Sequence, residues 1–449
     1  MNFDVFRAYD VRGVYPTDID ETAYYRIAQG YVYTFRPKVV VVGADARLSS
    51  PPLKKALISG LLDAGVDVVD IGNITTDMLY FATGAYGYSG GIIVSASHNP
   101  GQYNGIKMVR EGVTAISSDT GLFDIRDAIV AQKDISVLSA KKGSLRTKEV
   151  IGDYIKHVLG FVDRAKIEKL TVVGNANFGF VGTSVTPIAR ELNLNLIPLN
   201  FEPDGSFPKG PPDPTLAENR FETEKLVRES RADFGAAWDA DADRVIFFDE
   251  TGAFVSGAYM MALLATIMLK KHGSQNKILY DPRVVWPVER AVSRIGGHAI
   301  MSKSGHAFMK DRLRSEDALF AGELSAHYYF RDNFYADNGV IPFLLVLEHL
   351  SETKMKLSEV MRPFMADHHM TGELNYRVAD MKAIIEHVKE RFGPQGEEDF
   401  TDGYSVEGNT WRFNIRPSNT EPYLRLNVEA RSPEALEKMR TELEKIIEG

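Results

Sequence analysis

Three stretches of the chain share one pattern of apolar and polar positions. Each begins with an apolar run of strand length, continues through a polar turn and a segment with apolar residues at helical spacing, and ends in a second apolar run. The stretches begin at Val39, Leu170 and Lys277. Each one predicts a strand, a crossover helix and a second strand, so the three copies indicate three similar α/β domains with mixed sheets.

The first of these stretches also carries boundary signals for its helix. Pro51 and Pro52 stand where a helix begins, and Gly65 stands where it ends. Leu53, Leu57 and Leu61 recur between them at helical spacing. These signals predict a helix packed on a sheet through a leucine stripe.

The pattern changes after about Met361. It predicts a strand, a helix over Met381–Phe392, two strands in which apolar and polar residues alternate, and a last helix that starts at Ser432 and Pro433. A smaller α+β domain is therefore expected at the end. With boundaries in the weakly hydrophobic stretch 132–147 and the turn 249–252, we expect domains over residues 1–142, 143–251, 252–362 and 363–449.

Composition narrows the class of protein. The chain has 449 residues, too many for one core. Its 52 basic and 61 acidic residues give a net charge of −9, and no basic run indicates a nucleic-acid surface. The absence of cysteine excludes disulfides, thiol catalysis and cysteine-bound metals. The start lacks a signal-peptide pattern, and the apolar run 258–269 is too short to span a bilayer, so we expect a cytoplasmic protein without membrane partners. Oligomeric state has no signal in the sequence.

A serine–histidine pair follows an apolar strand. Residues 91–94 are apolar, and Ser97 and His98 come next on a loop with Pro100 and Gly101 that leads to Lys107. An isolated pair of this kind is usually a turn serine bonded to its own backbone. A hydroxyl, an imidazole and an ammonium on one strand-end loop nevertheless indicate a site for chemistry if other segments agree.

Three aspartates stand at alternate positions, and they suggest a metal site. Asp239, Asp241 and Asp243 point to one side if the chain is extended, and three carboxylates on one face suit Mg²⁺. A calcium loop of the EF-hand kind is the alternative, but it needs glycine where Arg244 stands and helices where apolar strands are predicted. A solvated acidic turn is the third interpretation.

Two further polar segments suit a sugar phosphate. Glu323, Ser325 and His327 offer groups that bind hydroxyls, although alone they are also typical of a surface loop. The hairpin 416–422 and the following Arg425 concentrate hydroxyls, an amide and guanidinium groups, which suit phosphate binding; an ordinary turn bounded by prolines is the alternative. The chain lacks the P-loop, dinucleotide and zinc-protease motifs, so those enzyme classes are disfavoured.

Six motifs, taken in order, resemble the α-D-phosphohexomutase family, most closely its phosphomannomutase/phosphoglucomutase branch. They are FRAYDVRG at 6–13, SASHNPGQYNGIK at 95–107, DADADR at 239–244, KSGHAFMK at 303–310, GELSAH at 322–327 and RPSNTEP at 416–422. The likeness covers essentially the whole chain. It implies four domains around a central cleft, each of which contributes one loop.

The resemblance also implies roles for individual residues. The phosphoserine is Ser97, which holds Mg²⁺ together with Asp239, Asp241 and Asp243. The catalytic group comprises Ser97, His98, Lys107, Arg12 and His327, with Lys107 and His327 as candidates for proton transfer and Arg12 assisting. The implied substrate-binding residues are Tyr9, Arg244, Arg283, His306, Glu323, Ser325, Arg416, Ser418, Asn419, Thr420 and Arg425.

The implied reaction is a phosphoryl exchange. Phosphorylated Ser97 gives its phosphoryl group to the 6-hydroxyl of a mannose or glucose 1-phosphate, the 1,6-bisphosphate turns over, and its 1-phosphate returns to the serine. Glucose or mannose 1,6-bisphosphate is therefore the expected activator, alongside Mg²⁺.

Departures from the family pattern leave the preferred sugar open. Ala326, Arg283 and Gly210 stand where glycine, lysine and histidine are common, whereas Asn419 agrees with the mannose/glucose branch. The nearest alternative is a phosphoglucosamine mutase, which usually has glutamine where Leu324 stands. A metal-dependent sugar-phosphate phosphatase and a noncatalytic sugar-phosphate sensor are the alternatives from other classes.

Overall fold

The computed structural model describes residues 1–131, 141–418 and 423–449. The chain forms two compact units. The first unit comprises residues 1–255 and 325–358, and the second comprises residues 256–324 and 359–449. Part of the expected first boundary, 132–140, lies outside the described residues, as do Asn419 and Thr420.

The first unit opens with a seven-stranded mixed sheet in the order β1-β5-β4-β2-β3-β7, with β6 paired to β5. Its strands are β1 (Val11–Val14), β2 (Val39–Ala44), β3 (Asp67–Asn73), β4 (Gly90–Val94), β5 (Tyr103–Arg110), β6 (Thr114–Ala115) and β7 (Leu145–Thr147). Its helices are α1 (Glu21–Phe35), α2 (Ser50–Asp63), α3 (Thr76–Ala85) and α4 (Leu122–Val130). Strands β2, β3 and β4 run parallel, so their carboxyl ends share one edge of the sheet.

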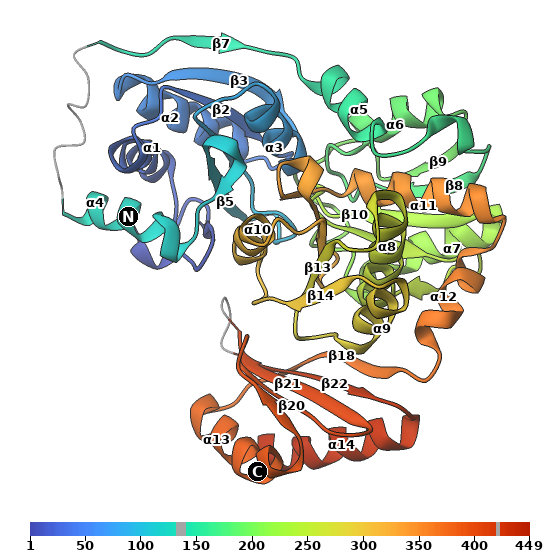
Figure 1. Ribbon diagram of the computed structural model, residues 1–449. Coiled ribbons are helices and arrows are strands. Elements are labelled where there is room, and N and C mark those ends of the chain that lie inside the picture. Colours follow the sequence, from blue (N-terminus) through green and yellow to red (C-terminus); the bar gives the residue numbers. More distant parts are fainter. Residues whose placement is uncertain (132–140, 419–422) are drawn as a thin grey trace. The chain divides into compact units, whose positions relative to one another are not determined.

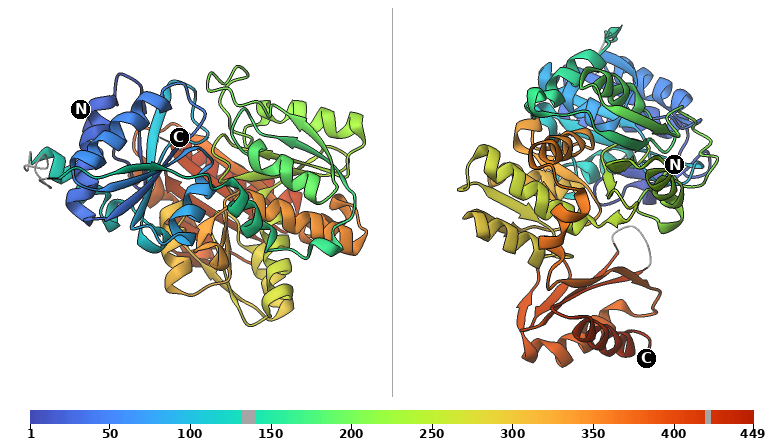
Figure 2. Two further views of the ribbon diagram at one scale, coloured as in Figure 1. Left: turned by 90° about the horizontal axis from the view of Figure 1, so that it is seen from above. Right: turned by 90° about the vertical axis from the view of Figure 1, so that its right-hand side faces the viewer.

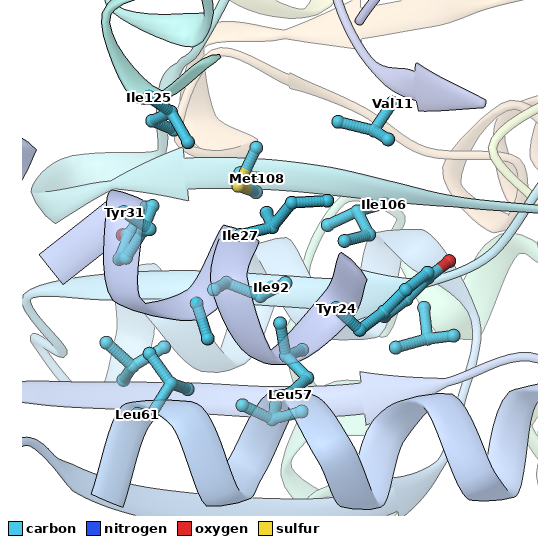
Figure 3. Close-up of a cluster of buried hydrophobic side chains, with 14 of the residues drawn as sticks. Val11, Tyr24, Ile27, Tyr31, Leu57, Leu61, Ile92, Ile106, Met108 and Ile125 are labelled. Carbon is cyan, nitrogen blue, oxygen red and sulfur yellow. The ribbon is translucent and has the colours of Figure 1, made fainter. Parts of the chain in front are cut away.

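The core of this sheet confirms the leucine stripe. Leu57 and Leu61 of α2 are fully buried beside Ile27 of α1 and the strand residues Ile92 and Ile106 (Figure 3). Burial of each such side chain contributes about 1.5–3 kcal/mol to folding. Packing of α1 and α2 against the sheet therefore holds β2 and β4 in position, together with the loops at their carboxyl ends.

A second sheet in the first unit has the order β12-β11-β10-β8-β9. Its strands are β8 (Thr171–Asn175), β9 (Asn195–Leu199), β10 (Phe234–Trp238), β11 (Val245–Phe248) and β12 (Phe254–Val255). The accompanying elements of this unit are α5 (Ile151–Leu159), α6 (Gly182–Glu191), α7 (Phe221–Ser230), β16 (Tyr328–Phe330), β17 (Ala336–Asp337) and α11 (Val340–Thr353). Strand β10 runs parallel to β8 and antiparallel to β11, so the acidic segment forms the turn between β10 and β11.

The second unit contains a parallel set in which β13 lies between β14 and β15. The elements of this part are α8 (Gly257–His272), β13 (Lys277–Tyr280), α9 (Trp286–Ile295), β14 (His298–Met301), α10 (His306–Ser315) and β15 (Phe320–Gly322). Helix α12 (Leu357–Met365) leads into the tail.

The tail is an antiparallel sheet in the order β18-β22-β21-β20-β19. Its elements are β18 (His369–Tyr376), α13 (Met381–Phe392), β19 (Glu397–Asp399), β20 (Tyr404–Glu407), β21 (Trp411–Pro417), β22 (Leu424–Ala430) and α14 (Pro433–Ile447). Both helices lie on one face of this sheet (Figures 1 and 2). The alternating residues Phe413, Ile415 and Leu426 point into the resulting core, and Ser432 caps α14.

The fold class predicted from the sequence is confirmed. The three crossovers are β2-α2-β3, β8-α6-β9 and β13-α9-β14, each with parallel strands. The tail helix occupies the predicted range, Met381–Phe392. Among the described residues, no helix is both long and apolar enough to cross a membrane. The four domain ranges given above stay a prediction.

Candidate active site

Ser97 stands on the loop that follows β4, and we call residues 95–103 the serine loop. The backbone of Ser97 is left-handed, with φ of 49°, a conformation that costs energy for a residue other than glycine. Its N–H donates to the Ser95 hydroxyl at 2.9 Å. The strained turn sits at a strand end, the position where a fold of this kind presents reactive groups.

A buried arginine that sequence reasoning missed holds the serine loop together. Arg47 is 1% exposed, and its guanidinium donates to the carbonyl oxygens of Ser97 at 2.6 Å and Pro100 at 2.7 Å. It also donates to the carbonyls of Asn99 and Tyr103 and pairs with Asp45. Arg47 follows β2, which neighbours β4 in parallel, so adjacency in the predicted sheet is the signal that could have identified it.

Arg12 reaches the same loop from β1, as the resemblance implied. Its guanidinium donates to the Ala96 carbonyl at 3.3 Å and to the side chain of Asn99. It also pairs with Asp10. Tyr9 is partly buried at the start of this segment. Two arginines therefore hold the loop that carries Ser97.

The three aspartates converge, but not for the reason given by the sequence. Residues 239–243, here called the acidic loop, form a turn with Ala242 in the left-handed region at φ of 56°. The expectation of an extended chain with alternating side chains was therefore wrong. One carboxylate oxygen from each of Asp239, Asp241 and Asp243 nevertheless lies within 4.8 Å of the others, and all three residues are buried. The turn gathers them more tightly than strand alternation would.

Ser97 lies directly at the acidic loop. Its hydroxyl donates to Asp239 Oδ2 at 2.8 Å. The same hydroxyl lies 3.1 Å from His98 Nδ1. Burial and the nearby cations Arg244, Arg12 and Lys107 hold the pKa of His98 well below its usual range, so this imidazole is neutral at physiological pH. The structure thus brings together the serine, the histidine and the carboxylates that the sequence singled out.

The carboxylate of Asp241 uses its two oxygens differently. Oδ2 accepts hydrogen bonds from Lys107 Nζ at 2.6 Å, Thr76 Oγ1 at 2.6 Å and Ser95 Oγ at 3.1 Å. Among the described residues, Oδ1 of Asp241 is buried and has no hydrogen-bond donor, and Oδ1 of Asp243 is buried with His327 Nε2 as a neighbour at 3.5 Å. Lys107 also pairs with Asp243.

Buried carboxylate oxygens without donors are the groups that a divalent cation satisfies, so this donor set fits a hard metal ion such as Mg²⁺. Burial and the charges of Asp243 and Asp241 raise the pKa of Asp239 well above its usual range. Three carboxylates this close repel one another, and a cation would relieve that repulsion.

Arg244 and His327 stand beside the acidic loop. Arg244 Nε donates to His327 Nε2 at 3.1 Å, and the other ring nitrogen lies 3.1 Å from Ser325 Oγ. His327 Nε2 is also 3.5 Å from Asp243 Oδ1. His327 therefore lies between Arg244, Ser325 and Asp243.

In the second unit, Glu323 and Arg283 form one cluster. Arg283 Nη2 is 3.3 Å from Glu323 Oε1, and that oxygen also accepts from the backbone N–H of Gly305 at 2.9 Å. His306 follows Gly305 at the start of α10. The division between the two units falls inside the motif GELSAH, with Glu323 in the second unit and Ser325 in the first.

The predicted phosphate-binding hairpin also lies in the second unit. Arg416 of β21 and Arg425 of β22 stand directly opposite each other. Both contact Glu373 of β18, at 2.8 Å and 3.1 Å. The Ser418 N–H donates to the Tyr423 carbonyl at 2.8 Å at the base of the hairpin. No motif in the sequence surrounds Glu373.

Comparison with known proteins matches every part of the fold. Four descriptions of the phosphoglucomutase/phosphomannomutase family fit the chain: α/β/α domain I at residues 4–134, domain II at 152–252, domain III at 256–368 and the C-terminal domain at 373–446.

Named relatives agree over their full lengths. The chain is 43% identical over 451 residues to phosphohexose mutases of Xanthomonas campestris pv. campestris (strain B100), with 100% of both sequences covered. It is 45% identical over 442 residues to phosphomannomutase of Salmonella typhimurium, with 97% of each covered.

A solved structure agrees as well. The crystal structure of a phosphoglucomutase/phosphomannomutase family protein from Burkholderia thailandensis superposes with a TM-score of 0.90 at 30% identity, covering 99% of this chain and 97% of that one. Because the likeness spans all four domains, the chain belongs to the phosphoglucomutase/phosphomannomutase family.

Proposed function

We propose that the chain is a phosphohexomutase that interconverts the 1-phosphates and 6-phosphates of mannose and glucose, with Ser97 as the phosphoryl carrier. One observation carries this proposal: the Ser97 hydroxyl lies 2.8 Å from Asp239 in a buried group of three carboxylates. A serine in this place needs no activating base, because phosphoserine itself is the donor. Relatives named phosphomannomutase support the choice of sugar phosphates.

The donor set supports a magnesium ion in this site. Asp239, Asp241 and Asp243 would hold it together with the phosphorylated Ser97. When bound, the ion neutralises negative charge on the phosphoryl oxygens during transfer. The chain itself orients one of these carboxylates, because Lys107, Thr76 and Ser95 all donate to Oδ2 of Asp241.

The contacts of two residues support a role in proton transfer to and from the sugar hydroxyl. Lys107 lies against Asp241 and Asp243, and His327 lies against Asp243 and Arg244, so both reach the region of the reacting serine. We assign Lys107 and His327 to these transfers, with Arg12 assisting through its hold on the serine loop.

The remaining predicted residues would bind the rest of the substrate. Arg283, Arg416 and Arg425, here called the arginine cluster, supply guanidinium groups for the nonreacting phosphate, together with the hairpin residues Ser418, Asn419 and Thr420. Glu323 and Ser325 would bind sugar hydroxyls, and Tyr9, Arg244 and His306 would complete the site. Glucose or mannose 1,6-bisphosphate would serve as intermediate and as the activator that phosphorylates Ser97.

A coupled assay tests the proposal. Mannose, glucose and glucosamine 1-phosphates are each supplied with Mg²⁺ and a trace of glucose 1,6-bisphosphate, and hexose 6-phosphate and inorganic phosphate are both measured. We expect 6-phosphates from mannose and glucose and little free phosphate, with Ser97→Ala as the blank. A strong preference for the glucosamine compound would indicate a phosphoglucosamine mutase. Stoichiometric phosphate release would indicate a phosphatase, and no turnover of any sugar would refute the proposal.

A further inference from the structure

Three guanidinium groups meet at one carboxylate in the second unit. Glu373 lies 2.8 Å from Arg416, 3.1 Å from Arg425 and 3.7 Å from Arg283, measured between carboxylate oxygen and guanidinium nitrogen. The Arg416 side chain is 5% exposed and that of Glu373 is 23% exposed. The whole arginine cluster therefore converges on a single internal anion.

The strand register explains why a counterion is needed here. Arg416 and Arg425 are direct cross-strand partners, and like charges in that arrangement repel. Other acids neutralise the cluster only in part. Arg283 pairs with Asp281 at 2.6 Å, and Arg416 Nε lies 3.8 Å from Asp402. Among the ion pairs of the described residues, those of Glu373 reach all three arginines.

Glu373 is charged at neutral pH. Its burial alone would raise the pKa, but Arg283, Arg416 and Arg425 together hold the pKa of this carboxyl below its usual value. Its two oxygens accept from separate guanidinium groups, Oε2 from Arg416 and Oε1 from Arg425. Phosphate oxygens make the same kind of charge-assisted contact with arginine.

We propose that Glu373 is a built-in counterion of the arginine cluster that competes with the substrate phosphate and limits how tightly the cluster binds it. The inference rests on the proposed function, which assigns the cluster to the nonreacting phosphate. A limited grip suits a reaction in which the bisphosphate must be released and rebound by its other end, because an over-tight site slows that exchange.

The opposite role is the main alternative, and it predicts the opposite sign. A carboxylate that merely orients arginines improves phosphate binding, so its loss weakens binding. A competing carboxylate opposes phosphate binding, so its neutralisation strengthens binding. The direction of the change in phosphate affinity therefore separates the two roles.

Calorimetric titration with inorganic phosphate, in the absence of divalent metal, tests the inference on the full chain. Glu373→Gln keeps the side-chain shape and removes the charge. We expect its phosphate Kd to fall about tenfold, which corresponds to about 1.4 kcal/mol. In steady-state assays KM for hexose 1-phosphate should fall together with kcat, because release becomes slower. The matched control is Glu437→Gln, which neutralises an exposed glutamate that pairs with Arg440 in the same domain, and it should change neither quantity.

Two further variants make every outcome decisive. Glu373→Asp keeps the charge but withdraws it by one methylene, so it should give an intermediate Kd and serves if the glutamine variant does not fold. Unchanged or weaker phosphate binding in a folded Glu373→Gln protein would overturn the inference. Arg416→Ala tests the underlying assignment separately: if it leaves phosphate affinity at the wild-type value, the arginine cluster is not the phosphate site and the proposed function fails at that point.

Discussion

The geometry around Ser97 depends on single buried side chains as much as on the reactive groups. Arg47 donates to four carbonyl oxygens of the serine loop while its own charge is paired with Asp45. No other residue type can make this set of contacts, because only arginine carries five donors in a fixed plane. Hydrogen bonds from Arg47 thus stabilise the left-handed turn at Ser97.

Replacing Arg47 tests this support. Arg47→Lys keeps the charge but leaves several buried carbonyls without donors, so we expect kcat to fall about ten- to a hundredfold and stability to fall by about 1–3 kcal/mol. Steady-state kinetics and denaturant unfolding measure the two effects. The exposed Arg36→Lys in the same domain is the control. Wild-type kcat in Arg47→Lys would show that the loop holds its shape without the guanidinium.

Residues inside motifs were predictable, and residues outside them were not. Ser97 follows an apolar strand and the three aspartates stand at alternate positions, which marks both as candidates for a site. The structure brings these groups together. Arg47 and Glu373 are single charged residues whose meaning comes from strand adjacency. Such residues are identified by the order of the strands in the sheet, which no motif in the sequence encodes.

At the level of elements, the start of α3 supports the acidic loop. The Thr76 N–H donates to the Asp241 carbonyl at 2.8 Å, and the Thr76 hydroxyl donates to Asp241 Oδ2 at 2.6 Å. This second contact leaves Oδ1 of Asp241 as the oxygen without a donor. The turn between β3 and α3 thus supplies one of three donors, with Lys107 and Ser95, that occupy Oδ2 of Asp241.

Removing the Thr76 hydroxyl should weaken metal binding. Thr76→Val keeps the shape but loses the donor, and we expect the Kd for Mn²⁺, measured by electron paramagnetic resonance, to rise about tenfold, in the range found for residues that orient metal ligands. Thr76→Ser should restore it. Thr83→Val removes a buried hydroxyl from the same helix that donates to the Leu79 carbonyl, so it is the matched control. Equal Mn²⁺ affinities in all four proteins would refute the role of Thr76.

The next residue on α3 gives the fold a pH dependence. Burial raises the pKa of Asp77 to about 7, although Thr75, Tyr154 and Met78 donate hydrogen bonds to it. The unfolded chain loses this proton near pH 4, so the folded state binds more protons between about pH 4 and pH 7. The stabilising contribution of Asp77 is therefore present at low pH and is lost as the pH rises through 7.

Asp77→Asn removes this titration. Relative to wild type, its Tm should become higher as the pH is raised from about 5 to about 8, because only the wild type loses the contribution of the protonated carboxyl. Thermal unfolding of both proteins at the two pH values measures the change in their difference. A difference that stays constant, or that shifts toward the wild type, would contradict the raised pKa.

The elements themselves were predictable to different degrees. Helix Met381–Phe392 and the strands around Phe413 and Leu426 follow directly from periodicity, since burial on one face dictates the pattern. The acidic loop was misjudged because alternation at Asp239 and Asp241 resembles a strand, whereas the left-handed Ala242 makes a turn. Periodicity carries no signal for a single positive φ.

At the level of the whole molecule, the residues of the proposed site belong to two different units. The first unit holds Ser97, the acidic loop and His327, and the second holds Glu323 and the arginine cluster. Three repeated crossovers made the domain number predictable, since each copy buries its own core. The preferred sugar was not predictable, because it depends on the positions of a small number of hydroxyl-binding groups around the sugar ring.

Because these residues belong to different units, we expect that binding of the nonreacting phosphate can be impaired without loss of Ser97 phosphorylation. Arg416→Ala removes a charge-assisted contact, which contributes about 1.5–3 kcal/mol, so kcat/KM should fall about ten- to a hundredfold. Phosphorylation of Ser97 by glucose 1,6-bisphosphate should persist, because Ser97 and the acidic loop belong to the first unit. Near-normal turnover by Arg416→Ala, or by a chain that ends at Met365, would contradict the assignment of the cluster.

The most direct test of the proposed phosphoserine mechanism is the phosphorylation of Ser97 itself. The full chain is incubated with glucose 1,6-bisphosphate and Mg²⁺, and intact mass and phosphopeptide mapping locate any phosphate. We expect one phosphate on the peptide that contains Ser97, none on that peptide in a folded Ser97→Ala variant, and no mutase turnover by that variant. A wild-type chain that turns over hexose phosphates while Ser97 never carries phosphate, or a Ser97→Ala variant that remains active, would contradict the proposed mechanism.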